Sequence, residues 1–177
     1  ANGGAIYNAG TTTISGAPFT INNATTNCGA VYSSGALQLQ GSSSVDSNVY
    51  VASGSTLTLA SKAVLTVNGA TINGTGTLTG SSDSTLVLSS SATLDIANAS
   101  LGNLTIANAA KASIEASTTV TKTFTVNGDL SIDDGITLKL VNGSSAALGS
   151  SGSIAGTIET AGAVKLSAGI VDNLIID

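Results

Sequence analysis

Thr56-Leu57-Thr58-Leu59 and Leu65-Thr66-Val67, each followed by small turn residues, decide the fold of this chain. In both segments aliphatic residues alternate strictly with small polar ones, so an extended strand buries one side and exposes the other. The same alternation recurs at 86–88, 94–96, 104–106, 124–126, 130–132 and 138–140. Strands this short cannot each bury a core of their own, whereas a stack of them can.

A longer repeat joins these strands. Gly4-Ala5-Ile6-Tyr7 is echoed by Gly29-Ala30-Val31-Tyr32, and Gly54 opens a further unit at the same interval. Between the first two units lie two more strand-like segments, 12–14 and 19–21. Such a period with three short strands is typical of a solenoid. We therefore predict an all-β chain that forms a single-stranded, right-handed parallel β-helix (β-solenoid) of about seven coils.

The predicted solenoid is one domain over 1–177, with 143–177 as its least regular part. Gly, Ser and Ala dominate the stretch up to residue 169, which has only brief apolar pieces at Ile154, Ile158, Val164 and Leu166. A β-sandwich built from the same strands stays open, because alternation does not report whether neighbouring strands run parallel. Sandwiches usually have a more aromatic core than the 3% aromatic content of this chain.

Alternation also assigns each side chain to a side of its strand. The residues predicted to point inward are Leu57, Leu59, Leu65, Val67, Leu86, Leu88, Leu94, Ile96, Leu104, Ile106, Phe124, Val126, Leu130, Ile132, Leu138 and Leu140. Those predicted to point outward are Thr56, Thr58, Thr66, Thr85, Thr93, Asp95, Thr105, Thr125 and Lys139.

Charge is scarce in this chain. Only 8% of the residues are charged, against roughly 25% in typical soluble domains, and the formal net charge is −5. Nothing here can form the basic groove that nucleic acids need, so we expect no nucleic-acid partner. No apolar run approaches the ~18 residues of a membrane-spanning helix, so we expect no transmembrane segment.

The acidic residues are scattered, and the closest group is Asp129, Asp133 and Asp134. A weak Ca²⁺ site and a solvated turn are the two interpretations of this group, and the pattern favours the turn. The chain has no His, which excludes a Ser-His-Asp set, and one Cys without His makes a poor zinc site. We predict no enzyme, with no catalytic, cofactor-binding or metal-binding residues and no cofactor.

Two further patterns have alternative interpretations. Thr-x-Thr pairs resemble the ice-binding arrays of other β-solenoids, but their irregular spacing predicts that several lie on different faces. They stand at 11–13, 56–58, 75–79 and 123–125. Asn residues that follow strand ends either stack as a corner ladder or serve local turns. They are Asn68, Asn98, Asn108 and Asn127.

The last strand-like segment is unusually apolar for the end of a solenoid. A possible assembly edge is formed there by Ile170, Val171, Leu174, Ile175 and Ile176. Such an edge invites pairing with another strand, so a homo-oligomer or filament is a candidate assembly. Cys28, the only cysteine, is interpreted as a small buried apolar residue, with an intermolecular bridge as the alternative.

The N-terminal fifth of the chain resembles a known family. Gly3-Gly4-Ala5-Ile6 has the form GGAI, Phe19-Thr20-Ile21-Asn22 has the form FxxN, and Cys28-Gly29-Ala30-Val31 is a degenerate second GGAI. These motifs resemble the repeats of polymorphic outer-membrane proteins, which are autotransporters with β-helical passengers. Residues 50–140 look like the coils of filamentous-haemagglutinin-type adhesins. The resemblance implies a right-handed parallel β-helix, a surface location and adhesion.

We therefore expect a secreted, non-enzymatic β-solenoid at the cell surface or in the extracellular space. It would act as a structural or adhesive protein, with a surface receptor, a glycan or copies of itself as partners. The alternative is the subunit of a self-assembling extracellular filament that pairs head-to-tail through its end strands. A polysaccharide lyase or hydrolase and an ice-binding protein are less favoured by the sequence.

Overall fold

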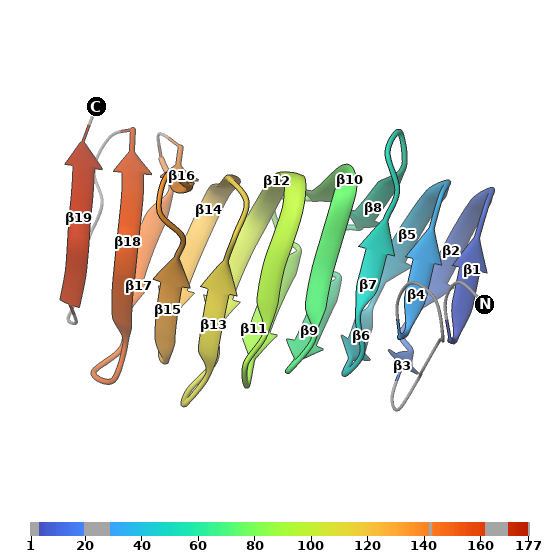
Figure 1. The fold of residues 1–177 in the computed structure, drawn as a ribbon, viewed down its shortest axis with the longest axis horizontal. Coiled ribbons are helices and arrows are strands. Elements are labelled where there is room, and N and C mark those ends of the chain that lie inside the picture. The colour runs from blue at the N-terminus through green and yellow to red at the C-terminus, as the bar shows by residue number, and fades with distance from the viewer. Residues whose placement is uncertain (1–3, 20–28, 142, 162–169, 177) are drawn as a thin grey trace.

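The chain forms a parallel β-solenoid of about seven turns, stacked from β1 near the N-terminus to β19 near the C-terminus (Figure 1). The computed structural model describes residues 4–19, 29–141, 143–161 and 170–176. All described elements are strands, and every pairing between them is parallel. The parallel pairing confirms the predicted solenoid and excludes the antiparallel sandwich.

The strands form three columns, which we call faces 1, 2 and 3. Face 1 contains β1 (Ile6–Asn8), β4 (Val31–Ser33), β7 (Val49–Val51), the start of β10 (Thr71–Gly80), the start of β12 (Thr93–Ile106), β13 (Lys111–Ile114), β15 (Asp129–Ile132), the start of β18 (Ser153–Thr160) and the start of β19 (Ile170–Ile176).

Face 2 contains β2 (Thr11–Ser15), β5 (Ala36–Gln40), β8 (Thr56–Leu59), the end of β10, the middle of β12, the start of β14 (Thr118–Val126), β16 (Thr137–Leu140) and the ends of β18 and β19. Face 3 contains β3 (Pro18–Phe19), β6 (Ser42–Val45), β9 (Val64–Asn68), β11 (Thr85–Ser89), the ends of β12 and β14, and β17 (Ser145–Leu148).

The interior is a continuous aliphatic column. Inward residues lie in register with apolar residues of the next turn, as Leu65, Leu86, Leu104 and Phe124 do on face 3. Every residue predicted to point inward is buried, and each predicted outward residue keeps some exposure. Burial of apolar area contributes roughly 25 cal/mol per Å², so this column is the main source of stability.

The turns differ in length. Ile6 pairs with Val31, which confirms the first interval of the repeat, but Val31 pairs with Val49, so the second turn is shorter than the first. The prediction that Gly54 opens the third unit is therefore wrong, because Gly54 lies in the corner between β7 and β8. Strand pairing fixes the register of the faces, whereas corners lie at the surface and tolerate different lengths.

Two glycines let one strand pass from one face to the next. Gly74, with a φ of +126°, lies where β10 bends from face 1 to face 2, and a Cβ there would stand 2.1 Å from the carbonyl oxygen of Val51. A Cβ on Gly102, at the bend of β12 from face 2 to face 3, would stand 2.0 Å from the carbonyl oxygen of Ser81. Only glycine fits such close stacking of two backbones.

The region predicted to be least regular continues the solenoid in part. Residues 145–148 and 153–160 form β17 and β18, and Ile154 and Ile158 are buried there as core residues. Val164 and Leu166, the other apolar pieces noted in the sequence, lie outside the described residues.

Candidate functional site

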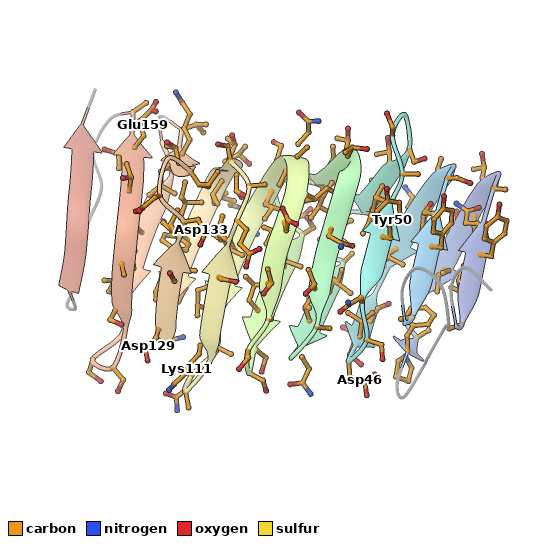
Figure 2. The ribbon with its side chains drawn as sticks, in the orientation of Figure 1. Asp46, Tyr50, Lys111, Asp129, Asp133 and Glu159 are labelled. Carbon is orange, nitrogen blue, oxygen red and sulfur yellow. The ribbon has the colours of Figure 1, made fainter. Side chains whose placement is uncertain are left out.

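The outward side of face 1 has a row of aligned side chains that we call the outer row. Tyr7, Tyr32, Tyr50, Asn73 and Asp95 lie in register in successive turns. Glu115 and Asp133 continue the row. The backbone N–H of Glu115 donates to the carbonyl of Leu94, which aligns Glu115 with Asp95. The backbone N–H of Asp133 donates to the carbonyl of Ile114, which aligns Asp133 with Glu115. The row is therefore aromatic toward the N-terminus and acidic toward the C-terminus, and Tyr50 and Asp133 both point to the viewer in Figure 2.

The three tyrosines form one aromatic stack. The ring centroids of Tyr7 and Tyr32 are 5.4 Å apart with planes 9° apart, and those of Tyr32 and Tyr50 are 5.4 Å apart with planes 15° apart. Tyr7 is the exposed end of the stack, with 58% of its surface accessible. This row was not predicted from the sequence, although each tyrosine directly follows an Ile or a Val, a pattern that marks equivalent positions in successive turns.

A groove begins where the aromatic part of the row ends. We call it the Tyr50 groove; its volume is about 370 Å³, and it is lined by Tyr50, Asn73, Gly74, Thr75, Asp95, Ala97 and Ala116. Gly74, Ala97 and Ala116 have little or no side chain, which leaves the space open beside the tyrosine ring. Successive turns of the solenoid contribute to this groove, so the register of β7, β10 and β12 determines its shape.

Asn73 has an unusual environment within this groove. Its Oδ1 atom is buried and has no hydrogen-bond partner in the structure. Buried polar atoms are hydrogen-bonded in the great majority of cases, so each exception calls for an explanation. The side-chain oxygen of Asn73 can therefore accept a hydrogen bond from a bound molecule, provided that the amide group first rotates about the Cβ–Cγ bond of Asn73.

The acidic group noted in the sequence does not come together. Asp129 begins β15 and Asp133 follows its end, so the two lie at opposite ends of the strand in Figure 2. An extended strand rises about 3.3 Å per residue, which separates positions four apart by about 13 Å. Asp129 instead accepts a hydrogen bond of 2.6 Å from Ser153 Oγ. Within the described residues, no three Cys or acidic side chains group as metal ligands do.

Other acidic side chains have local partners across the turns. Ser81 and Ser61 donate hydrogen bonds of 2.7 and 2.8 Å to Asp83, and these two bonds lower the pKa of Asp83 to about 2. Glu159 pairs with Lys139 in the outward row of face 2. The Ser61–Asp83 and Lys139–Glu159 contacts join successive turns of the solenoid.

Three of the four Thr-x-Thr pairs lie on face 2. Thr56 and Thr58 align directly with Thr77 and Thr79, and through Ala36 and Gln38 with Thr11 and Thr13. The fourth pair, 123–125, lies on face 3. The expectation of irregular placement is thus wrong for three pairs, because unequal corner lengths bring them into register. The row is interrupted by Gln38 and, further on, by Lys139 and Glu159.

The four Asn residues do not form one ladder. Asn98 aligns with Thr77 on face 2, whereas Asn68 ends β9 on face 3 and aligns with Ser89. Asn68 Oδ1 accepts a hydrogen bond of 2.7 Å from Ser90 Oγ, a contact between neighbouring turns. Asn108 and Asn127 border a small surface depression between turns. Local turn roles therefore account for these residues better than a shared corner ladder.

The proposed assembly edge lies in β19, which pairs with β18 at the C-terminal end of the stack (Figure 1). The structure describes the backbone, but not the side chains, of Ile170, Val171, Leu174, Ile175 and Ile176. Cys28 also falls outside the described residues.

Comparison with protein-family models, with curated proteins and with solved structures gave no match for this chain. Among the residues that the structure describes, there is no helix long and apolar enough to cross a membrane. The interpretation of the site therefore depends on its own geometry.

Proposed function

We propose that the chain is a non-enzymatic structural and adhesive β-solenoid of the cell surface or extracellular space. The observation that carries the proposal is the unbroken stack of in-register strands around one aliphatic interior. Parallel ladders of this kind hold outward side chains in fixed rows, so the protein offers a stiff, extended surface. The short motifs that resemble polymorphic outer-membrane proteins support the surface location.

The outward surface supports an adhesive role without strong charge. On face 3 the central outward row is uncharged and consists of Ser44, Thr66, Val87, Thr105, Thr125 and Ala147. Low charge gives little electrostatic steering, so binding on such a surface depends on shape and hydrogen bonds. The carboxylates of Asp95, Glu115 and Asp133 lie in one outward row in successive turns. Polysaccharide cleavage uses two carboxyl groups about 5–9.5 Å apart around the bond, so the test below includes cleavage as an outcome.

An adhesion assay tests the proposal. Beads coated with the purified chain are expected to adhere to cell monolayers or extracellular matrix, whereas beads coated with albumin are not. Incubation of the chain with a polysaccharide panel is expected to yield no new reducing or unsaturated ends. Equal adhesion of both kinds of bead would overturn the adhesive role, and new chain ends would overturn the non-enzymatic one.

A filament subunit is the second candidate. It is favoured by the position of β1 and β19 at opposite ends of the stack (Figure 1), each of them paired to one neighbouring turn among the described strands. The exposed ring of Tyr7 also offers a further stacking surface at the β1 end. Electron microscopy distinguishes the candidates, because ordered fibres support the filament and monodisperse monomers contradict it.

A further inference from the structure

We propose that the Tyr50 groove binds a neutral saccharide, an inference that rests on the adhesive role and names the chemistry of its ligand. The groove brings together one aromatic ring, one amide, one hydroxyl and one carboxylate, from Tyr50, Asn73, Thr75 and Asp95. Its volume of about 370 Å³ lies at the lower end of the roughly 300–1,000 Å³ typical of small-molecule sites.

The aromatic wall suits the C–H face of a pyranose. Tyr50 is the last ring of the stack, so Tyr32 covers one side of it and fixes its orientation. The groove opens on the side of Tyr50 where Asn73 is the next residue of the outer row. An aromatic ring carries negative charge on its face and attracts weakly positive C–H groups, and its rigidity lowers the entropy lost on binding.

The polar groups of the groove suit sugar hydroxyls. The carboxylate of Asp95 accepts two or more hydrogen bonds, and the Thr75 hydroxyl and the Asn73 amide both donate and accept. The Oδ1 of Asn73 is buried and has no partner in the structure, so it accepts from a ligand hydroxyl only after the side-chain amide turns outward about the Cβ–Cγ bond. Asn73 and Asp95 align in adjacent turns, which places these acceptors side by side along the solenoid axis.

Charge selects a neutral ligand over an anionic one. None of the described lining residues is a lysine, whereas Asp95 is one of them, and Glu115 follows in the next turn of the outer row. A uronate or another acidic sugar would meet like charge here, which disfavours its binding. The small side chains of Ala97 and Ala116 leave room for a sugar ring without a steric cost.

The test uses maltotriose, cellotriose, mannotriose and chitotriose as probes, with trigalacturonate as the charged comparator. Binding is measured by calorimetry, and the contact region by amide chemical shifts. At least one neutral trisaccharide is expected to bind with a Kd of about 1 mM or tighter. The Tyr50→Ala and Asp95→Asn variants are expected to weaken binding about tenfold. Tyr7→Ala and Asp133→Asn are matched controls, because they change the same outer row away from the groove.

The outcomes separate this inference from the adhesive role. If no neutral trisaccharide binds, if trigalacturonate binds equally well, or if both groove variants bind like the wild type, the inference is overturned. Bead adhesion measured on the same proteins is independent of this result. Adhesion without trisaccharide binding would overturn the saccharide site and keep the adhesive role. Trisaccharide binding without adhesion would keep the saccharide site and overturn the adhesive role.

Discussion

The ring of Tyr50 stacks on the ring of Tyr32 with centroids 5.4 Å apart, because the two tyrosines lie in register in successive turns. Tyr32 is the middle ring and makes both stacking contacts of the row. Such pairs contribute about 0.5–1.5 kcal/mol each beyond their buried area. Stacking between turns therefore adds to the hydrogen bonds that hold neighbouring strands together.

Removal of the middle ring tests this stack. We expect Tyr32→Ala to lower the free energy of unfolding by about 1–3 kcal/mol, because it removes two ring contacts, and Tyr32→Phe to change it little. Chemical denaturation followed by circular dichroism gives both values. Tyr7→Ala is the control, since it removes one contact at an exposed end. An equal effect of the alanine changes at positions 7 and 32 would contradict the stack.

Gly10 and Gly35 lie in neighbouring turns, and we expect substitution by alanine to affect stability differently at the two positions. A Cβ on Gly35 would stand 2.1 Å from the carbonyl oxygen of Gly10, whereas a Cβ on Gly10 would meet nothing within 4 Å. We expect Gly35→Ala to destabilise the protein by about 1–3 kcal/mol through overpacking. Gly10→Ala should stay within about 0.5 kcal/mol of the wild type. Thermal unfolding of the two variants checks this. A Gly35→Ala variant as stable as the wild type would contradict the close stacking of these two turns.

Phe124 tests the continuity of the interior. Its side chain is fully buried and lies in register between Leu104 and Ala146 on face 3. Phe124→Ala should lower the free energy of unfolding by about 3–5 kcal/mol, because it leaves a cavity in the core. Phe124→Leu should cost less, and Thr125→Ala, on the outward side of the same strand, is the matched control. Equal effects at positions 124 and 125 would contradict the assignment of inward and outward sides.

The pH dependence of Asp83 gives a separate test. Hydrogen bonds from Ser81 and then Ser61 lower its pKa from the ordinary 3.8 to about 2. Because the pKa is lowered in the folded state, the two bonds stabilise the fold above about pH 4, and this stabilisation is lost as the pH falls through 2.

Carboxyl NMR titration should find the pKa of Asp83 near 2 and a shift toward 3.8 in Ser81→Ala, with a smaller shift in Ser61→Ala. Asp83→Asn should remove the same part of the acid sensitivity between about pH 4 and 2. A wild-type pKa at the ordinary value would show that the two serines do not bond this carboxylate.

Local alternation predicted the core correctly because it is a property of single strands. Leu57 and Leu59 point inward, as their spacing requires, and each pairs with an aliphatic residue of the preceding turn. The parallel fold and the number of coils followed from the longer repeat with three strands, not from alternation alone. Contacts between turns were harder to predict, because they depend on corner lengths that the strands do not encode.

The error at Gly54 and the missed tyrosine row have the same cause. The interval between Ile6 and Val31 is one turn of the solenoid, as predicted. The same interval was assumed for the next turn, which is shorter, so the third unit was expected after Val49, where the structure places it. With the true register, Tyr50 falls directly beside Tyr32. The groove beside Tyr50 was not predictable, because it depends on small residues from several turns that only the stacked structure brings together.

The stacking of turns can be measured directly along the outward row of face 2. Thr13, Gln38, Thr58, Thr79, Ser100 and Thr119 lie in this row, one from each successive turn. In a Cys28→Ser background, pulsed EPR between spin labels at positions 13 and 100 should give about 19 Å, and between 13 and 119 about 24 Å, since each turn adds about 4.8 Å. Distances that fail to increase with each turn, as in an antiparallel sandwich, would contradict the solenoid.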